Sequence, residues 1–157
     1  MAVEFTSHGT QCLDQVRKII CNMGLPRIDR EEVQVRKKPW NREVIYQGCT
    51  IWATKEIYAA GTNERDDVGY GCVITFAAYD SQDMSSNLDQ IPIWISAVRN
   101  KFNFLGRLDI TLRKQCSFGI INVSDFNTKP PAQHPDAGKY ELESLLVRAW
   151  IREARAS

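Results

Sequence analysis

Two stretches of the chain carry apolar residues at the spacing of an amphipathic helix. Cys12–Met23 has apolar residues at every third or fourth position, and Gly24 follows as a natural stop. Ile91–Leu105 repeats the pattern, with Asp89 as the expected N-cap. The sequence therefore predicts two amphipathic helices, each of which must bury its apolar face against another element.

Between these helices the apolar period changes from helical to extended. Val, Ile, Tyr, Trp and Thr alternate in part with polar residues in Glu31–Lys37, Glu43–Gln47 and Thr50–Tyr58, which predicts two or three strands. Tyr70–Tyr79 is apolar at both sets of alternate positions. A strand of this kind is typical of the centre of a sheet that is covered on both faces.

The C-terminal third predicts further strands around an irregular segment. Leu108–Leu112 alternates, and Phe118–Val123 is a short apolar run. Residues 127–139 contain three prolines and are expected to form an extended surface loop or arm. The apolar residues of Leu142–Ile151 fit both a helical stripe and a strand. We predict a strand, because a sheet with so many segments needs a closing partner.

Length and element order together define the fold class. A chain of 157 residues corresponds to one domain, 1–157, in which the first ten residues are expected to be mobile. The order helix, strands, helix, strands predicts an α+β fold. We expect an antiparallel or mixed β-sheet with two main helices packed on one face, long loops and the Pro-rich arm.

Composition and charge argue against several classes of function. Twenty Lys and Arg residues against nineteen Asp and Glu residues leave a net charge of +1, which disfavours specific nucleic-acid binding. No apolar stretch approaches the roughly 20 residues that cross a bilayer, and the N-terminus lacks the pattern of a signal peptide. The five widely spaced cysteines are expected to be reduced thiols in a cytoplasm.

The sequence offers few groups for catalysis. The chain has two histidines, His8 near the N-terminus and His134 in the Pro-rich segment, and neither is expected to be held beside a nucleophile. Cys72 is expected to be a buried core residue and His134 an exposed loop residue. Nucleophile-elbow, zinc-protease, Walker and dinucleotide-binding motifs are all absent from the sequence. We therefore expect no enzymatic activity, no cofactor and no metal site.

Charge is divided among segments of the chain, although the total is close to neutral. Arg27–Arg42 and Arg99–Lys114 are basic, whereas Asn63–Asp67 and Asp80–Asp89 are acidic. This division fits either an ordinary mixed surface or complementary patches that meet head to tail between copies of the chain. Trp40 lies in a polar turn, where a large ring is typical of a contact with a neighbour.

Three motifs carry a resemblance to a protein family. They are KKPWNR at residues 37–42, GTNERDDVGYG at residues 61–71, which is predicted to be a loop before an apolar strand, and LVRAW at residues 146–150. With these motifs and its order of elements, the chain over residues 11–152 resembles small neck proteins of tailed bacteriophages, and tail terminators most of all. The Pro-rich arm and the five cysteines are not matched to that family.

The resemblance implies a structural virion protein, assembled in the host cytoplasm and located in the tail or neck. The resemblance implies that copies form a sixfold ring that caps the tail tube. This ring would contact the tail tube protein and connector or stopper proteins. DNA can pass through such a ring. The resemblance implies no membrane partner for the protein. The residues expected at contacts are Trp40, Arg42, Arg65, Asp66, Asp67 and Tyr70. Alternatives are a connector adaptor or stopper, and a small cytosolic enzyme or ligand-binding domain.

Overall fold

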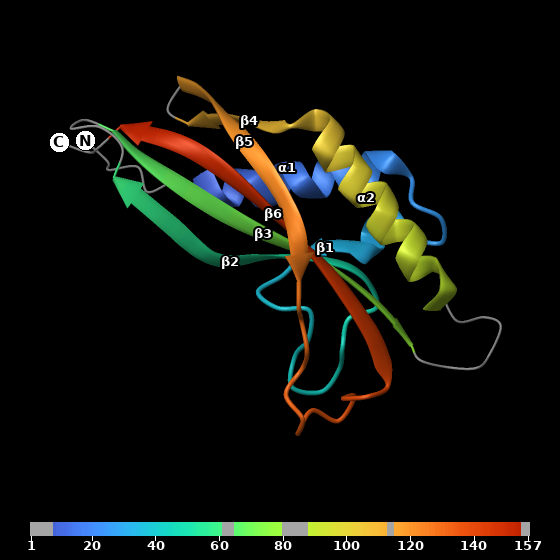
Figure 1. The fold of residues 1–157 in the computed structure, drawn as a ribbon. Helices are drawn as coiled ribbons and strands as arrows, with labels where there is room; N and C mark the ends of the chain where they lie inside the picture. Colours follow the sequence, from blue (N-terminus) through green and yellow to red (C-terminus); the bar gives the residue numbers. More distant parts are fainter. Residues whose placement is uncertain (1–7, 61–64, 80–87, 113–114, 155–157) are drawn as a thin grey trace.

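The protein is an α+β domain built on one mixed sheet, as the sequence predicts (Figure 1). A computed structural model describes residues 8–60, 65–79, 88–112 and 115–154, with the backbone alone for 59, 60, 65, 109–112, 115–119 and 154. Six strands lie in the order β1-β2-β3-β6-β5-β4. β1 pairs with β2 in parallel, and all other pairs are antiparallel. The elements are α1 (His8–Met23), β1 (Val33–Val35), β2 (Gly48–Ala60), β3 (Arg65–Tyr79), α2 (Ile91–Leu105), β4 (Arg107–Leu112), β5 (Gln115–Phe126) and β6 (Tyr140–Ala154).

α1 forms where the apolar stripe predicts it. Cys12, Val16 and Ile20 are buried along one face. Gly24 takes a positive φ of 65° directly after the last helical residue, a conformation that glycine adopts without steric cost. Arg17 crosses to the sheet, and its Nε donates a hydrogen bond to the Val33 carbonyl oxygen at 2.9 Å. The helix is therefore held to the sheet by apolar burial and by one directed polar contact.

α2 starts from a different N-cap than predicted and ends at a glycine suited to that position. Gln90, not Asp89 as predicted, is the N-cap, because a short 3-10 turn over Leu88–Gln90 precedes the helix. At the other end Gly106 takes a φ of 68° and its N–H bonds to the Phe102 carbonyl. Trp94 is buried and donates its indole N–H to the Pro26 carbonyl at 2.8 Å. In the described part of the chain, neither helix is long and apolar enough to cross a membrane.

The pairing of β3 with β6 places two different sets of side chains on the two faces of the sheet. The two strands are in register over fifteen residue pairs, so alternate residues of each strand share a face. One set joins the core cluster to which both α1 and α2 contribute. Its members on the two strands are Val68, Tyr70, Cys72, Ile74, Phe76, Ala78, Leu145, Val147, Ala149 and Ile151.

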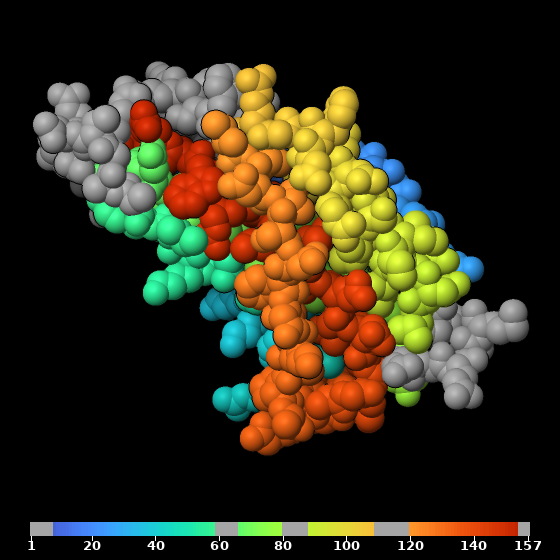
Figure 2. All heavy atoms as spheres, viewed as in Figure 1, coloured from blue at the N-terminus to red at the C-terminus, as the bar shows by residue number. Residues whose placement is uncertain are grey.

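The opposite face of the sheet, which we call the helix-free face, is covered over one half only. There Val73, Thr75 and Ala77 of β3 are buried, although none of them belongs to the core cluster to which the helices contribute. The irregular segments 36–47 and 127–139 lie at the end of the sheet that contains these buried residues, in the lower part of Figures 1 and 2. The nine consecutive buried residues of β3 from Tyr70 to Ala78 confirm the prediction of a central strand.

Several predicted boundaries are wrong. Glu43–Gln47 is not a strand: it contributes a single antiparallel bridge, Trp40 with Ile45, because the chain turns back on itself there. The predicted loop Gly61–Gly71 is mostly strand, since β3 begins at Arg65, and residues 61–64 lie outside the described residues. Leu142–Ile151 is a strand, as predicted, and the helical alternative is wrong.

Gly71 of β3 tests how closely the side chains pack over the helix-free face. A Cβ at this position would overlap Thr54 Cγ2 and lie 3.2 Å from Leu146 Cδ1. We expect Gly71→Ala to lower the free energy of unfolding by about 1–3 kcal/mol, because a β-branched strand residue has little freedom to move away. Urea unfolding followed by tryptophan fluorescence measures the change.

Removing the overlapping methyl group provides the control. Thr54→Ser lacks Cγ2, so the double variant should recover part of the lost stability. If Gly71→Ala alone were as stable as the wild type, the close packing over β3 would be contradicted.

Candidate interaction surfaces

A polar cluster fixes the first turn of α1 to the sheet. His8 Nδ1 contacts the carboxylate of Glu153 on β6, and the Tyr70 hydroxyl of β3 donates to the same carboxylate. Burial, followed by this hydrogen bond, raises the pKa of Tyr70 above its usual range. The sequence-based expectation of a mobile segment is thus wrong for His8–Thr10, which lie in the helix, while residues 1–7 lie outside the described residues.

The buried cysteines are core residues with suppressed ionisation. Burial raises the pKa of the Cys12 thiol to about 12, and the Glu153 carboxylate adds to this shift. Burial raises the pKa of Cys49 and Cys72 as well. Because the thiolate is the nucleophilic form, these thiols are unsuited to covalent catalysis at neutral pH. The prediction of Cys72 as a buried core residue is confirmed.

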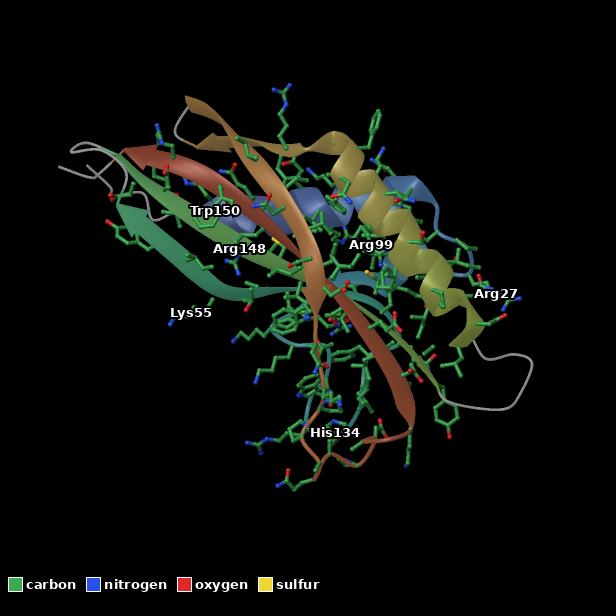
Figure 3. All side chains as sticks on the ribbon, in the orientation of Figure 1. Arg27, Lys55, Arg99, His134, Arg148 and Trp150 are labelled. Carbon is green, nitrogen blue, oxygen red and sulfur yellow. The ribbon has the colours of Figure 1, made fainter. Side chains whose placement is uncertain are left out.

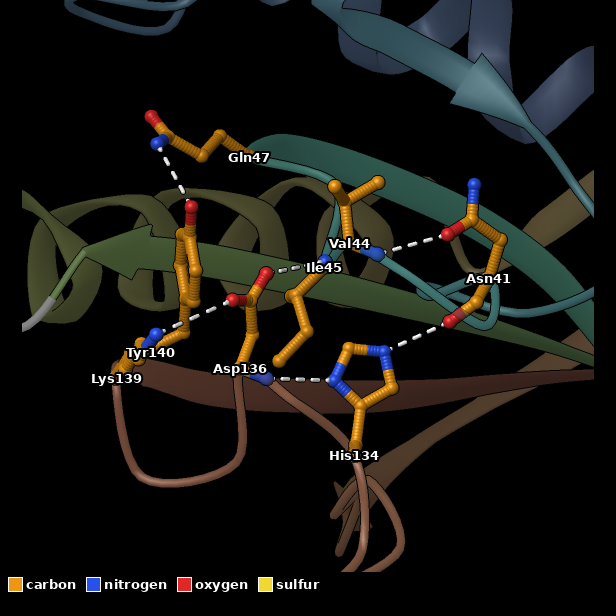
Figure 4. Close-up of polar contacts among 8 residues, drawn as sticks. All are labelled: Asn41, Val44, Ile45, Gln47, His134, Asp136, Lys139 and Tyr140. Atoms are coloured by element: carbon orange, nitrogen blue, oxygen red, sulfur yellow. Dashed lines mark hydrogen bonds and ion pairs between the residues drawn. The ribbon is translucent and has the colours of Figure 1, made fainter.

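His134 joins the two irregular segments that cover the helix-free face (Figure 4). Its Nδ1 accepts a hydrogen bond from the Asp136 N–H at 3.0 Å, so Nε2 carries the proton and donates to the Asn41 carbonyl at 2.7 Å. Asp136 Oδ2 accepts a further bond from the Ile45 N–H at 3.3 Å. We call these contacts the His134 latch.

The latch corrects one expectation. His134 is buried, with 9% of its surface exposed, because Nε2 binds segment 36–47 while Nδ1 binds the backbone of its own segment; the expectation of an exposed histidine is wrong. Residues 127–139 have no helix or strand, which agrees with the predicted loop, and His134 and Asp136 hold this loop to segment 36–47. Ser144 on β6 donates to Thr128 at 2.9 Å and also contacts Thr75 on β3 at 2.8 Å, which ties the segment to the sheet.

A shallow hollow of about 410 Å³ lies beside the latch. Segment 36–47 and the Pro-rich segment both contribute to its wall. The lining residues are Trp40, Asn41, Arg42, Pro131, Gln133, His134 and Pro135. Trp40 is half-buried and Arg42 exposed, so the structure brings together two of the residues expected at contacts between copies.

The other half of the helix-free face is open and carries an apolar row across four strands. In register across β2, β3, β6 and β5 lie Ile57, Gly69, Trp150 and Ile120. The Trp150 ring lies over Gly69, where a Cβ would come within 3.1 Å of it. Ile57 is 45% exposed and Ile120 66% exposed. We call these residues the open apolar row.

Arg148 borders this row and stiffens the adjoining edge of the sheet. Its guanidinium crosses β3 and donates to the carbonyl oxygens of Gly69 at 3.2 Å and Lys55 at 3.4 Å. Lys55 lies at a register shift of β2 between Thr54 and Ile57. Beyond Trp52, β2 pairs with β3 alone among the described strands. Figure 3 shows Arg148, Trp150 and Lys55 at the end of the sheet away from His134.

The remaining residues expected at contacts are placed differently. Asp67 forms an ion pair with Arg152 on β6 at 2.9 Å, and the hydrogen bond from Arg152 lowers the Asp67 pKa. Asp66 is half-buried on the same strand. Tyr70 is buried under α1, so it is unsuited to a contact between copies. The side chain of Arg65 lies outside the described residues.

Sequence reasoning did not identify Ile57, Ile120 or Trp150 as surface residues. Their apolar side chains look like core positions in a strand, and only the register shows that they share an uncovered face. One signal was present: Ile120 and Ile121 are adjacent in a strand, so only one of them can face the core.

The arrangement of polar groups offers no metal centre within the described ranges, where no three His, Cys, Asp or Glu side chains come together in a suitable group. Comparison of the chain with models of known protein families finds no match, and comparison with curated proteins finds none either. The surfaces described above are therefore the features of the protein that bear on its function.

Removal of the His134 latch should destabilise the covered half of the face. We expect His134→Ala to lower the free energy of unfolding by about 1–3 kcal/mol, because the Asp136 N–H and the Asn41 carbonyl lose their partner. Amide hydrogen exchange should accelerate in segments 36–47 and 127–139 and remain unchanged in α1. Equal protection of both segments in the variant would show that the latch does not hold them.

The buried thiols should resist alkylation in the folded protein. At pH 8, Cys12, Cys49 and Cys72 are expected to react with a thiol reagent only after unfolding, because burial and a raised pKa both suppress the thiolate. A Cys116→Ser variant avoids interference from the fifth cysteine, and mass spectrometry with and without urea locates the label. Rapid labelling of the native protein would contradict this burial.

Proposed function

We propose that the chain is a structural protein of a tailed-phage neck, a tail terminator whose copies form a ring that caps the tail tube and joins the tail to the head. The ring would be sixfold and would contact the tail tube protein on one side and connector or stopper proteins on the other. It needs no cofactor and catalyses no reaction.

The open apolar row is the observation that carries this proposal. Among the described residues, segments 36–47 and 127–139 cover one half of the helix-free face, whereas on the other half Ile57 and Ile120 are exposed and Trp150 is half-buried between them. A contiguous exposed apolar row on a folded domain is typical of a surface that packs against another protein. Basic Arg148 and Lys55 beside the row provide a polar rim of the kind that surrounds such contacts.

The element order supports the same proposal. A helix and three strands are followed by a second helix and three strands, and the resemblance to neck proteins rests on this order and on the three sequence motifs. Residues 65–71 of one motif and residues 146–150 of another lie on paired strands, since Gly69 is opposite Trp150. They therefore contribute to the open apolar row together.

The histidine and tyrosine side chains that could act in catalysis form hydrogen bonds within the domain, which favours a structural role over an enzymatic one. His134 uses both ring nitrogens within the latch, and His8 and Tyr70 share the Glu153 carboxylate. The alternative from the same phage neck is a connector adaptor or stopper. The alternative from a different class of protein is a small enzyme or ligand-binding domain.

Assembly of the purified protein tests the proposal. Native mass spectrometry and electron microscopy over a range of concentrations should show a ring of six copies with an axial channel. Ile57→Asp with Ile120→Asp should raise the concentration for half-assembly at least about tenfold, because charged groups would replace the apolar contact. The monomer should keep the circular dichroism of the wild type.

Val44→Asp is the matched control, since Val44 is 44% exposed, close to the 45% of Ile57, but lies on segment 36–47, away from the row. It should leave assembly unchanged. A protein that is monomeric at every concentration and also on purified tails would overturn the proposal. A twelvefold ring bound to a portal would assign the chain to the connector adaptors instead.

A further inference from the structure

Phe104 of α2 is the most exposed large apolar residue in the described part of the chain. Its surface is 86% exposed. It lies two residues after the buried Phe102, about 200° around the helix, so its ring points away from the sheet. A single exposed apolar residue does not define an interaction surface. The groups around Phe104 therefore decide whether a partner can bind there.

The end of α2 that carries Phe104 has a partial negative charge. The Gly106 N–H bonds to the Phe102 carbonyl oxygen. No backbone N–H within the described ranges donates to the last three carbonyl oxygens of the helix, those of Asn103, Phe104 and Leu105. The last turn carries no basic side chain either. Because free carbonyl groups and the helix dipole both favour a cation, this end of α2 is suited to an Arg or Lys side chain of a partner.

The hollow beside the His134 latch has the complementary properties. The half-buried Trp40 and the exposed Pro131 and Pro135 give it apolar walls. Arg42 lines it as well, and its guanidinium has neither an ion pair nor a hydrogen bond with any other described residue. A cavity of roughly 150 Å³ can hold a benzene ring. The volume of about 410 Å³ therefore has room for the side chain of Phe104.

The wall of the hollow is formed before a partner binds. The two ring nitrogens of His134 are hydrogen-bonded to Asn41 and Asp136, which holds the Pro-rich segment against segment 36–47. Trp40 is fixed by its antiparallel bridge with Ile45. Because these residues are already ordered, binding costs little of their conformational entropy. The hollow is thus a preorganised apolar site with a free cation at its edge.

The hollow and α2 lie on opposite sides of the sheet. α2 contributes to the core cluster on one face. The two segments that form the hollow cover the helix-free face. Because Phe104 points away from the sheet, it cannot enter the hollow of its own chain. A contact between the two requires a second copy of the chain.

We infer that the hollow beside the His134 latch binds the C-terminal end of α2 from a second copy of the chain. The Phe104 ring packs against Trp40, and Arg42 donates to the last carbonyl oxygens of the helix. This inference rests on the proposed assembly of copies and names one of its contacts. Each copy binds one neighbour with its hollow and another with its α2, and a head-to-tail contact of this kind can close into a ring.

Two complementary variants test the contact. Phe104→Ser removes the ring and keeps the hollow, whereas Trp40→Ala with Arg42→Glu changes the hollow and keeps the ring. Each variant alone should raise the concentration for half-assembly at least about tenfold. An equal mixture should form a complex of one copy of each, because Phe104 of the second variant still binds the hollow of the first. Sedimentation velocity and native mass spectrometry measure both results.

Matched control variants make the same chemical changes outside the contact. Ile93→Ser also removes an exposed apolar residue from α2, but at the opposite end of the helix. Lys38→Glu reverses the charge of an exposed residue of segment 36–47 that does not line the hollow. Both should assemble like the wild type. If Trp40→Ala fails to fold, Arg42→Glu alone tests the hollow and should weaken assembly about threefold.

The outcomes separate this contact from the proposed function. A mixture without a complex would overturn the inference. So would hollow variants that lose binding to purified tails while Phe104→Ser keeps both tail binding and assembly, because the hollow would then bind a tail protein. A complex in the mixture without a sixfold ring of the wild type would support the contact and contradict the proposed function. A sixfold ring that forms equally well from Phe104→Ser would do the opposite.

Discussion

The fifteen-residue pairing of β3 with β6 is the constraint on which the other features of the domain depend. β3 is buried over nine consecutive residues, so both of its faces must be covered and both of its edges must be paired. β2 and β6 satisfy the edges, and the two helices cover one face. The remaining face has to be covered by irregular chain, which explains why two such segments fold against it.

Directed polar contacts hold that second cover in place. A relay of side chains runs from Trp52 through Thr75 and Ser144 to Thr128, with separations of 2.8–2.9 Å. The His134 latch then joins the segment that contains Thr128 to segment 36–47. Because each of these groups is buried or nearly so, every member needs its partner, and the two segments act as one unit.

The proposed assembly makes use of what this arrangement leaves uncovered. The cover ends before the open apolar row, where Ile57 and Ile120 are exposed. A subunit of a ring that also contacts a tube and a connector needs several such surfaces.

The periodicity of the sequence determined the two helices, the central strand and the α+β class, because each depends on which residues within a short segment are apolar. The sequence determined the end of α1 as well, since Gly24 favours the required φ. Strand boundaries were less accessible: β3 begins at Arg65 within a segment rich in Gly and Asp, where pairing with β2 and β6 overrides local turn propensity. Only the tertiary structure decided that Ile57, Trp150 and Ile120 share one exposed row, that Tyr70 is buried, and that His134 is held by two distant segments. Each of these outcomes depends on strand register or on contacts between residues far apart in the chain, which local sequence patterns do not encode.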